Sequence, residues 1–177
     1  MEWDKNFEIC KQKFLYIEIW SVATSPDGKS VMTVRDNDVM INDIEMNFTR
    51  EEFRQTLAVK GSVAGRAPVV VDDQTIACVE RSSGLNVSLY EYDNGKFPAK
   101  GSLKDGHDMI INALLINGNS LVSAGWDSKI VLWDIKALQK KQEFGCESYI
   151  NTLCWADKDK KQVLAGGKNE YLIWVQL

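Results

Sequence analysis

A layout of short apolar segments separated by turns recurs along the chain at intervals of a little over forty residues. It is clearest in residues 106–135, GHDMIINALLINGNSLVSAGWDSKIVLWDI, where a Gly-His pair and a Trp-Asp pair enclose three strand-like segments. The same layout follows once and precedes twice, and the places corresponding to its last tryptophan are held by Asn42, Tyr90, Trp133 and Trp174. Repeats of this length with three or four strands each favour an all-β fold of stacked units.

Turn residues and apolar runs divide each unit in a similar way. In the first unit, the segment Ser25-Pro26-Asp27-Gly28 is typical of a tight reversal. The runs at 69–71 and 171–175 are almost continuously apolar, as expected of strands covered on both faces. Because one sheet cannot bury both of its faces alone, we expect the units to pack side by side.

The four units resemble WD40 repeats, and the third carries the signature of that family in Gly106-His107, Asp127 and Trp133-Asp134. The last unit, which ends in Ile173-Trp174, matches less closely, and the first two match weakly. The resemblance implies WD40-type β-propeller blades, about four four-stranded antiparallel repeats that form part of a larger ring. We expect an outer strand of a preceding or closing blade at 1–13, then blades at 14–52, 53–96, 97–137 and 138–177, of which the last lacks its outer strand.

The closure of this ring has three solutions. Residues 3–14, WDKNFEICKQKF, align without gaps with residues 133–144, WDIKALQKKQEF, and therefore correspond to the end of one repeat. The chain can be a piece of a longer propeller, or two chains can share a larger ring. It can also be a ring of four blades, in which residues 5–13 add the outer strand of the last blade.

The resemblance also implies a hydrogen-bonded chain inside the third unit, formed by His107, Ser123, Asp127 and Trp133. A buried imidazole needs partners for both nitrogens, which the carboxylate and the hydroxyl can supply while the indole N–H donates to the hydroxyl. We expect this network to be structural. The other units have Leu15, Ser62 and Cys146 in place of the histidine, so the first two blades should depend more on apolar packing.

By the same resemblance, loops on one rim of the propeller bind partners. Positions near the start of the innermost strand and before the turn aspartate give the candidates Glu18, Trp20, Arg35, Ile110, Asn112, Trp126, Tyr149 and Asn151, with Gly167 beside them in the last unit and Gly65 and Ala67 in a featureless second unit. Trp126 fits partner contact and packing equally well. Trp20 lies in an apolar stretch that favours the core, where Trp155 and Trp174 are also expected.

Charge and composition narrow the function classes. The net charge is -4 and the basic residues are scattered, which argues against direct nucleic-acid contact. No apolar run approaches the roughly 18 residues of a membrane span, and no signal sequence is recognisable, so we expect an intracellular protein, cytoplasmic rather than nuclear. The four cysteines form no CxxC pair, and with a single histidine they make a poor metal set.

The sequence therefore predicts a non-catalytic protein-protein interaction scaffold that binds proteins or peptides, possible members of a multiprotein complex, and uses no cofactor or metal. An enzyme is not expected, because the one histidine is committed to the structural network and no base remains for a nucleophile. One alternative is a structural subunit or fragment that completes a propeller with another chain, by self-association, or with the rest of a longer polypeptide. Another is a regulatory domain attached to an enzyme.

Overall fold

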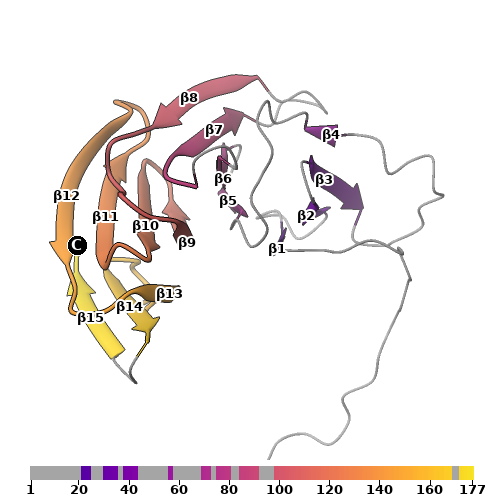
Figure 1. The fold of residues 1–177 in the computed structure, drawn as a ribbon. Helices are drawn as coiled ribbons and strands as arrows, with labels where there is room; N and C mark the ends of the chain where they lie inside the picture. Colours follow the sequence, from indigo (N-terminus) through magenta and orange to yellow (C-terminus); the bar gives the residue numbers. More distant parts are fainter. Residues whose placement is uncertain are drawn as a thin grey trace, which may run out of the picture.

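The computed structural model describes residues 21–24, 30–35, 38–43, 56–57, 69–72, 75–80, 84–91, 98–168 and 172–177. These residues form β-strands and connecting turns that build four antiparallel sheets (Figure 1). The all-β fold of propeller blades expected from the sequence is confirmed. Within the same described residues, no helix is long and apolar enough to cross a membrane.

Each sheet is built from strands that follow one another in the sequence. The first contains β1 (Ser21–Thr24), β2 (Ser30–Arg35), β3 (Asp38–Asp43) and β4 (Thr56–Leu57). The second contains β5 (Val69–Asp72), β6 (Thr75–Val79), β7 (Val87–Glu91) and β8 (Ala99–Leu103). The third contains β9 (Ile111–Asn117), β10 (Ser120–Gly125), β11 (Lys129–Asp134) and β12 (Gln139–Gly145). The fourth contains β13 (Ile150–Trp155), β14 (Gln162–Gly167) and β15 (Leu172–Gln176).

The sheets stand side by side around an open arc (Figure 1). Their first strands line its inner side, where β1 packs beside β5, β5 beside β9, and β9 beside β13. The strands β4, β8 and β12 lie at the outer edges of their sheets. In Figure 1, β1 and β13 lie apart at the two ends of the arc.

The third sheet buries both of its faces, as its continuous apolar runs predict. Leu121, Val131 and Trp133 belong to a core cluster shared with the second sheet. Val122, Ala124 and Ile130 belong to a cluster shared with the fourth sheet. Each fully buried side chain of this size contributes about 1.5–3 kcal/mol of transfer free energy, so neighbouring sheets are the main source of stability for the third sheet.

The sequence repeats and the sheets are offset by one strand. Residues 97–137 supply β8 to the second sheet and β9, β10 and β11 to the third. The repeats that begin with β4, β8 and β12 therefore each join two neighbouring sheets, because the first strand is the outer strand of one sheet and the following strands begin the next. This connection ties the sheets together along the chain.

Candidate functional site

The third and fourth sheets share a backbone arrangement at the rim of the arc, which we define as the edge where β9 and β13 begin and where β10 and β14 end. The amide of Trp126 donates to the carbonyl oxygen of Ile110 over 2.9 Å, and the amide of Lys168 donates to that of Tyr149 over 3.2 Å. A Cβ on Gly125 would lie 2.5 Å from the Ile110 carbonyl oxygen. Glycine is therefore required immediately before the rim residue.

This arrangement brings Trp126 of the third sheet next to Tyr149 of the fourth. Their aromatic rings are 6.5 Å apart between centroids and are inclined at 50°, a separation at which aromatic pairs attract each other. The ammonium of Lys168 lies 5.2 Å from the centroid of the Tyr149 ring and donates to its hydroxyl over 3.2 Å. Contacts from both sheets thus fix the orientation of the two rings.

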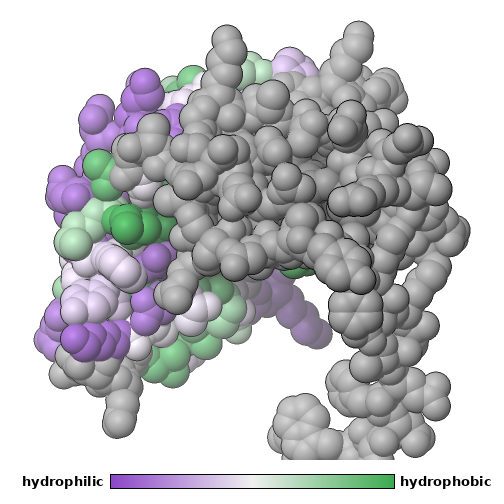
Figure 2. All heavy atoms as spheres, turned by 45° about the vertical axis from the view of Figure 1, so that its right-hand side comes forward, coloured by the Kyte–Doolittle hydropathy of each residue, from purple (hydrophilic) through white to green (hydrophobic). Residues whose placement is uncertain are grey.

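The side chains of this region remain open to solvent. Met109, Ile110, Trp126 and Tyr149 are each 38–49% exposed, and with Lys168 they form what we call the rim cluster. Figure 2 shows hydrophobic side chains reaching the surface between hydrophilic ones in the described part of the molecule. Lys168 takes part in none of the ion pairs formed by the described residues, and the rim cluster combines apolar surface with the positive charge of this side chain.

The register of the last sheet corrects two expectations. Gly167 pairs with Ile150 as Gly125 pairs with Ile111, so the residue equivalent to Trp126 is Lys168 and not Gly167. By the same register, Trp174 pairs with Leu164 and takes the place of Leu132 rather than that of Trp133. Trp174 is 67% exposed, so the expectation that it lies in the core is wrong, whereas Trp155 is partly buried against the second cluster.

The remaining rim candidates have different surroundings. The amide of Asn112 donates to the carbonyl oxygen of Ile150 over 3.0 Å, so this side chain joins β9 to β13 instead of being free for a partner. Asn151 is exposed. Arg35 is the last residue of β2, but its side chain is not described. The whole of each of the other candidates lies outside the described residues: Glu18, Trp20, Ser62, Gly65 and Ala67.

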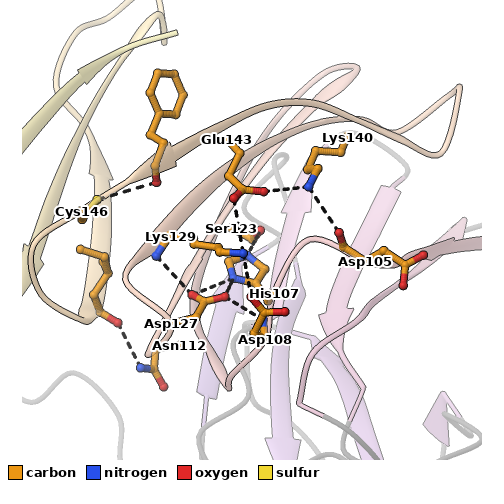
Figure 3. A network of polar contacts seen from close by, with 12 residues as sticks. Asp105, His107, Asp108, Asn112, Ser123, Asp127, Lys129, Lys140, Glu143 and Cys146 are labelled. Carbon is orange, nitrogen blue, oxygen red and sulfur yellow. Dashed lines mark hydrogen bonds and ion pairs between the residues drawn. The ribbon is translucent and has the colours of Figure 1, made fainter.

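A chain of hydrogen bonds links Trp133, Ser123, His107 and Asp127 in the third sheet, and Figure 3 shows its part from Ser123 through His107 to Asp127. The indole Nε1 of Trp133 donates to Ser123 Oγ over 2.8 Å, and this hydroxyl lies 2.7 Å from His107 Nε2. His107 Nδ1 lies 2.9 Å and 3.1 Å from the two carboxylate oxygens of Asp127. The geometry fits a neutral imidazole that donates from Nδ1 to the carboxylate and accepts the Ser123 proton at Nε2.

Burial lowers the pKa of His107, although the negative charge of Asp127 and the hydrogen bond to it act in the opposite direction. A neutral imidazole agrees with the donor and acceptor pattern around it. The side chain of His107 is fully buried, and the adjacent Gly106 packs against Trp133 so closely that a Cβ at position 106 would overlap the indole. Gly106 and His107 are therefore both required by the same packed indole.

The carboxylate of Asp127 also accepts hydrogen bonds from the backbone on both sides of the rim. It accepts from the amide of Asp108 over 2.9 Å and from the amide of Lys129 over 3.2 Å. The first of these amides precedes Met109 and Ile110, and the second follows the turn that begins at Trp126. The network thus holds the two segments that carry the third sheet's part of the rim cluster, and we regard His107, Ser123 and Trp133 as positioning residues.

Ion pairs surround the network on its solvent side (Figure 3). Lys129 Nζ lies 2.7 Å from an Asp108 carboxylate oxygen and 3.4 Å from one of Glu143. Lys140 Nζ lies 2.7 Å from the other oxygen of Glu143. These exposed pairs contribute little individually, and they orient the segment before β9 against β11 and β12.

The second sheet contains a polar cluster that was not expected from the sequence. The carboxylate of Glu80 accepts hydrogen bonds from Asn86 Nδ2 over 3.0 Å, from Ser88 Oγ over 2.8 Å and from Ser102 Oγ over 2.9 Å. Partial burial raises the pKa of Glu80, but these hydrogen bonds outweigh that effect and lower the pKa. Here Cys78 and Tyr90 hold the places of Ser123 and Trp133, and Glu80 joins β6, β7 and β8 instead of a histidine network.

The described residues offer neither a group of metal ligands nor a reactive nucleophile beside a free base. No group of three or more histidine, cysteine, aspartate or glutamate side chains could hold a metal ion within the described part of the chain. Cys78 is buried, and desolvation, followed by the charge of Glu80, raises its pKa to about 12, so it is not a reactive thiolate. His107 has both nitrogens occupied.

Comparison with known proteins agrees with the architecture. The family described as WD domain, G-beta repeat matches residues 100–134. The chain is 24% identical over 173 residues to the periodic tryptophan protein 2 homologue of Caenorhabditis elegans, in an alignment that covers 76% of this chain. The chain spans only 19% of the length of that relative. Among solved structures, the computationally designed Ika4 protein superposes with a TM-score of 0.65 at 20% identity, over 94% of this chain and 96% of the other, which shows a shared fold.

Proposed function

The chain carries a WD40 repeat on a fold of propeller blades, and we propose that it is a non-catalytic scaffold whose rim cluster binds partner proteins or peptides. WD40 repeats are typical of protein-interaction scaffolds. The observation that carries the proposal is the pair of exposed aromatic rings, Trp126 and Tyr149, which lie on different sheets and contact each other at the rim.

The rim cluster has the composition of a binding surface. Tryptophan and tyrosine dominate the energetics of protein interfaces because they offer large apolar area with few rotatable bonds. Grouped with Met109 and Ile110, they form an apolar patch at an exposed edge, and such grouped patches mark interaction sites more often than scattered apolar residues do.

The charge of the patch indicates the chemistry of its partner. Lys168 is held against Tyr149 and has no carboxylate partner among the described ion pairs. A partner segment with an apolar or aromatic side chain close to a carboxylate would cover the two aromatic rings and neutralise Lys168. Such a segment is our proposed ligand for the rim cluster.

The hydrogen-bonded chain that ends at Asp127 supports a partner-binding role for the rim cluster. Asp127 accepts backbone hydrogen bonds from the two segments that carry Met109, Ile110 and Trp126, so this part of the rim cluster is ordered before a partner binds. Preorganised side chains lose less conformational entropy on association, which favours affinity.

The test compares partner capture by the wild-type chain with capture by Trp126→Ala. The matched control is Leu138→Ala, because Leu138 is as exposed as Trp126, at 38%, but lies in the turn between β11 and β12 at the opposite edge of the sheet. Quantitative mass spectrometry of the captured proteins should show partners that are lost with Trp126→Ala and retained with Leu138→Ala. Equal recovery by all three chains would contradict the proposal.

We also propose that this activity lies inside the cell, in the cytoplasm. The cysteines among the described residues, Cys78, Cys146 and Cys154, are free thiols, which is the form that a reducing compartment maintains. Fractionation of cells that express a tagged chain would test this placement, and recovery in a secreted fraction would contradict it.

A further inference from the structure

Positions that are buried between neighbouring sheets are exposed on the outer face of the last sheet. Ile130 pairs with Ala124, the residue before Gly125. Leu172 pairs with Gly166, the residue before Gly167, so Leu172 holds the place of Ile130. Ile130 is fully buried where the fourth sheet covers the third, whereas Leu172 is 72% exposed. Trp174 follows two residues later on the same face and is 67% exposed. The fourth sheet therefore exposes an apolar face equivalent to the face that the third sheet buries against the fourth.

In the first sheet, at the other end of the arc, Val22 presents an exposed apolar side chain. Ala23 packs against the core cluster shared with the second and third sheets, and successive strand residues point to opposite faces, so Val22 faces away from that cluster. Val22 is 61% exposed, whereas Leu114 and Leu153, which face the preceding sheet from the inner strands β9 and β13, are 5% and 9% exposed.

The two uncovered faces are the two halves of one repeated junction. In the junction between the third and fourth sheets, the face with Ile130 meets the face with Leu153. At the ends of the arc, Leu172 holds the first of these places and Val22 lies on a face of the second kind. We propose that the last sheet of one copy docks against the first sheet of a second copy, head to tail, and that two such junctions join two copies into one propeller ring.

A second copy is the occupant favoured by the structure because one chain offers both halves of the junction. A contact between different surfaces of identical chains is heterologous, and it gives a closed assembly when the rotation between copies completes a circle. The arc formed by the four sheets is open and curved in Figure 1, so a second arc of equal size can close it. Closure would also remove the exposed edge of β15.

The first measurement is the mass of the wild-type chain by size-exclusion chromatography with light scattering across a range of concentrations. The proposal predicts a species of twice the 20.0 kDa chain mass. Trp174→Glu and Val22→Glu should each raise the dissociation constant at least about 30-fold, the effect of losing one buried anchor residue. Leu138→Ala, in the turn between β11 and β12, is the control and should leave the mass unchanged.

A mixing experiment tests the head-to-tail geometry itself. Each junction needs an intact last sheet from one copy and an intact first sheet from another, so neither glutamate variant can form a junction alone. An equimolar mixture of Trp174→Glu and Val22→Glu retains one intact junction and should recover a species of double mass. Circular dichroism and thermal melting of each variant establish that it is folded, since both substituted positions are exposed in the single chain.

Three results would overturn the proposal. The first is a wild-type mass of 20.0 kDa at every concentration, as given by a chain that closes on itself or is covered by further blades of a longer polypeptide. The second is double mass retained by either folded glutamate variant. The third is a mixture that remains at the mass of the single chain.

Discussion

Trp126 and Tyr149 belong to different sheets, yet their aromatic rings lie 6.5 Å apart between centroids at an exposed edge of the molecule. The Trp126 amide, next to Gly125, donates to the Ile110 carbonyl oxygen, and the Tyr149 carbonyl oxygen accepts the equivalent hydrogen bond from Lys168, next to Gly167. The repeat therefore builds the same rim twice with different side chains. If these aromatic rings served mainly to stabilise the fold, they would be buried in the core. Their exposure favours a role in binding a partner.

Loss of the imidazole should weaken the fold without directly removing a rim side chain. His107→Ala leaves the Ser123 hydroxyl proton without its acceptor and removes the imidazole donor of Asp127, and we expect a loss of about 1–3 kcal/mol in the free energy of unfolding. Urea denaturation followed by tryptophan fluorescence measures it. Asp108→Asn, which removes an exposed ion pair with Lys129, should leave the urea midpoint near that of the wild type. An unchanged midpoint for His107→Ala would refute the network.

Acid should destabilise the protein through the same residue. The folded pKa of His107 lies below its usual value because of burial, so below about pH 6.5 the unfolded chain binds a proton that the folded chain does not. Stability should therefore fall as pH falls from 7 towards 5. Because the chain has one histidine, His107→Gln should remove most of this dependence. Urea midpoints measured at several pH values test the prediction, and a wild-type midpoint that rises on acidification would contradict it.

Packing against Trp133 should make position 106 intolerant of a side chain. A Cβ on Gly106 would overlap the indole, and overpacking of this kind typically costs about 1–3 kcal/mol. Gly145→Ala is the matched control, because a Cβ at that position meets no atom within 4 Å. We expect thermal melting to show a lowered Tm for Gly106→Ala and a Tm near that of the wild type for Gly145→Ala. Equal melting temperatures would show that the indole can move aside.

The carboxylate of the second sheet should also be structural. Glu80→Ala leaves Ser88 and Ser102 without their acceptor, and we expect a loss of about 1–2 kcal/mol. Glu147→Ala, at an exposed position, serves as the control for the removal of one negative charge. Differential scanning calorimetry of both variants tests the difference. A Glu80→Ala variant as stable as the control would mean that water replaces the carboxylate.

The fold was predictable because the information for it is repeated. Turn residues and apolar runs recur in four copies, and the copy at residues 106–135 carries the family signature clearly enough to place strands in the others. The four residues of the hydrogen-bonded chain could be named because the resemblance to WD40 repeats implies them position by position within a single repeat. Contacts between repeats were not accessible in this way, because the distance between Trp126 and Tyr149 depends on how two sheets pack.

The register of the last sheet was misjudged because one aromatic side chain was used as its marker. Trp174 was matched to Trp133, but backbone pairing is set by Gly167, whose Cβ would collide with the Tyr149 carbonyl group. Matching Gly125-Trp126 with Gly167-Lys168 would have identified Lys168 from sequence. Glu80 carried no comparable signal, because its hydrogen-bond donors come from two other strands and an adjoining loop residue.

The central claim is that the two aromatic rings at the rim recognise a partner and do not serve the core. Its most direct test is the affinity of a captured partner for the wild-type chain and for the double variant Trp126→Ala/Tyr149→Ala, measured by calorimetry beside the Tm of each chain. We predict that the affinity falls at least about 30-fold, while the Tm stays within about 2 °C, because substitutions at exposed positions rarely change stability by more than about 0.5 kcal/mol. An unchanged affinity, or a loss of affinity matched by a large fall in Tm, would contradict the account.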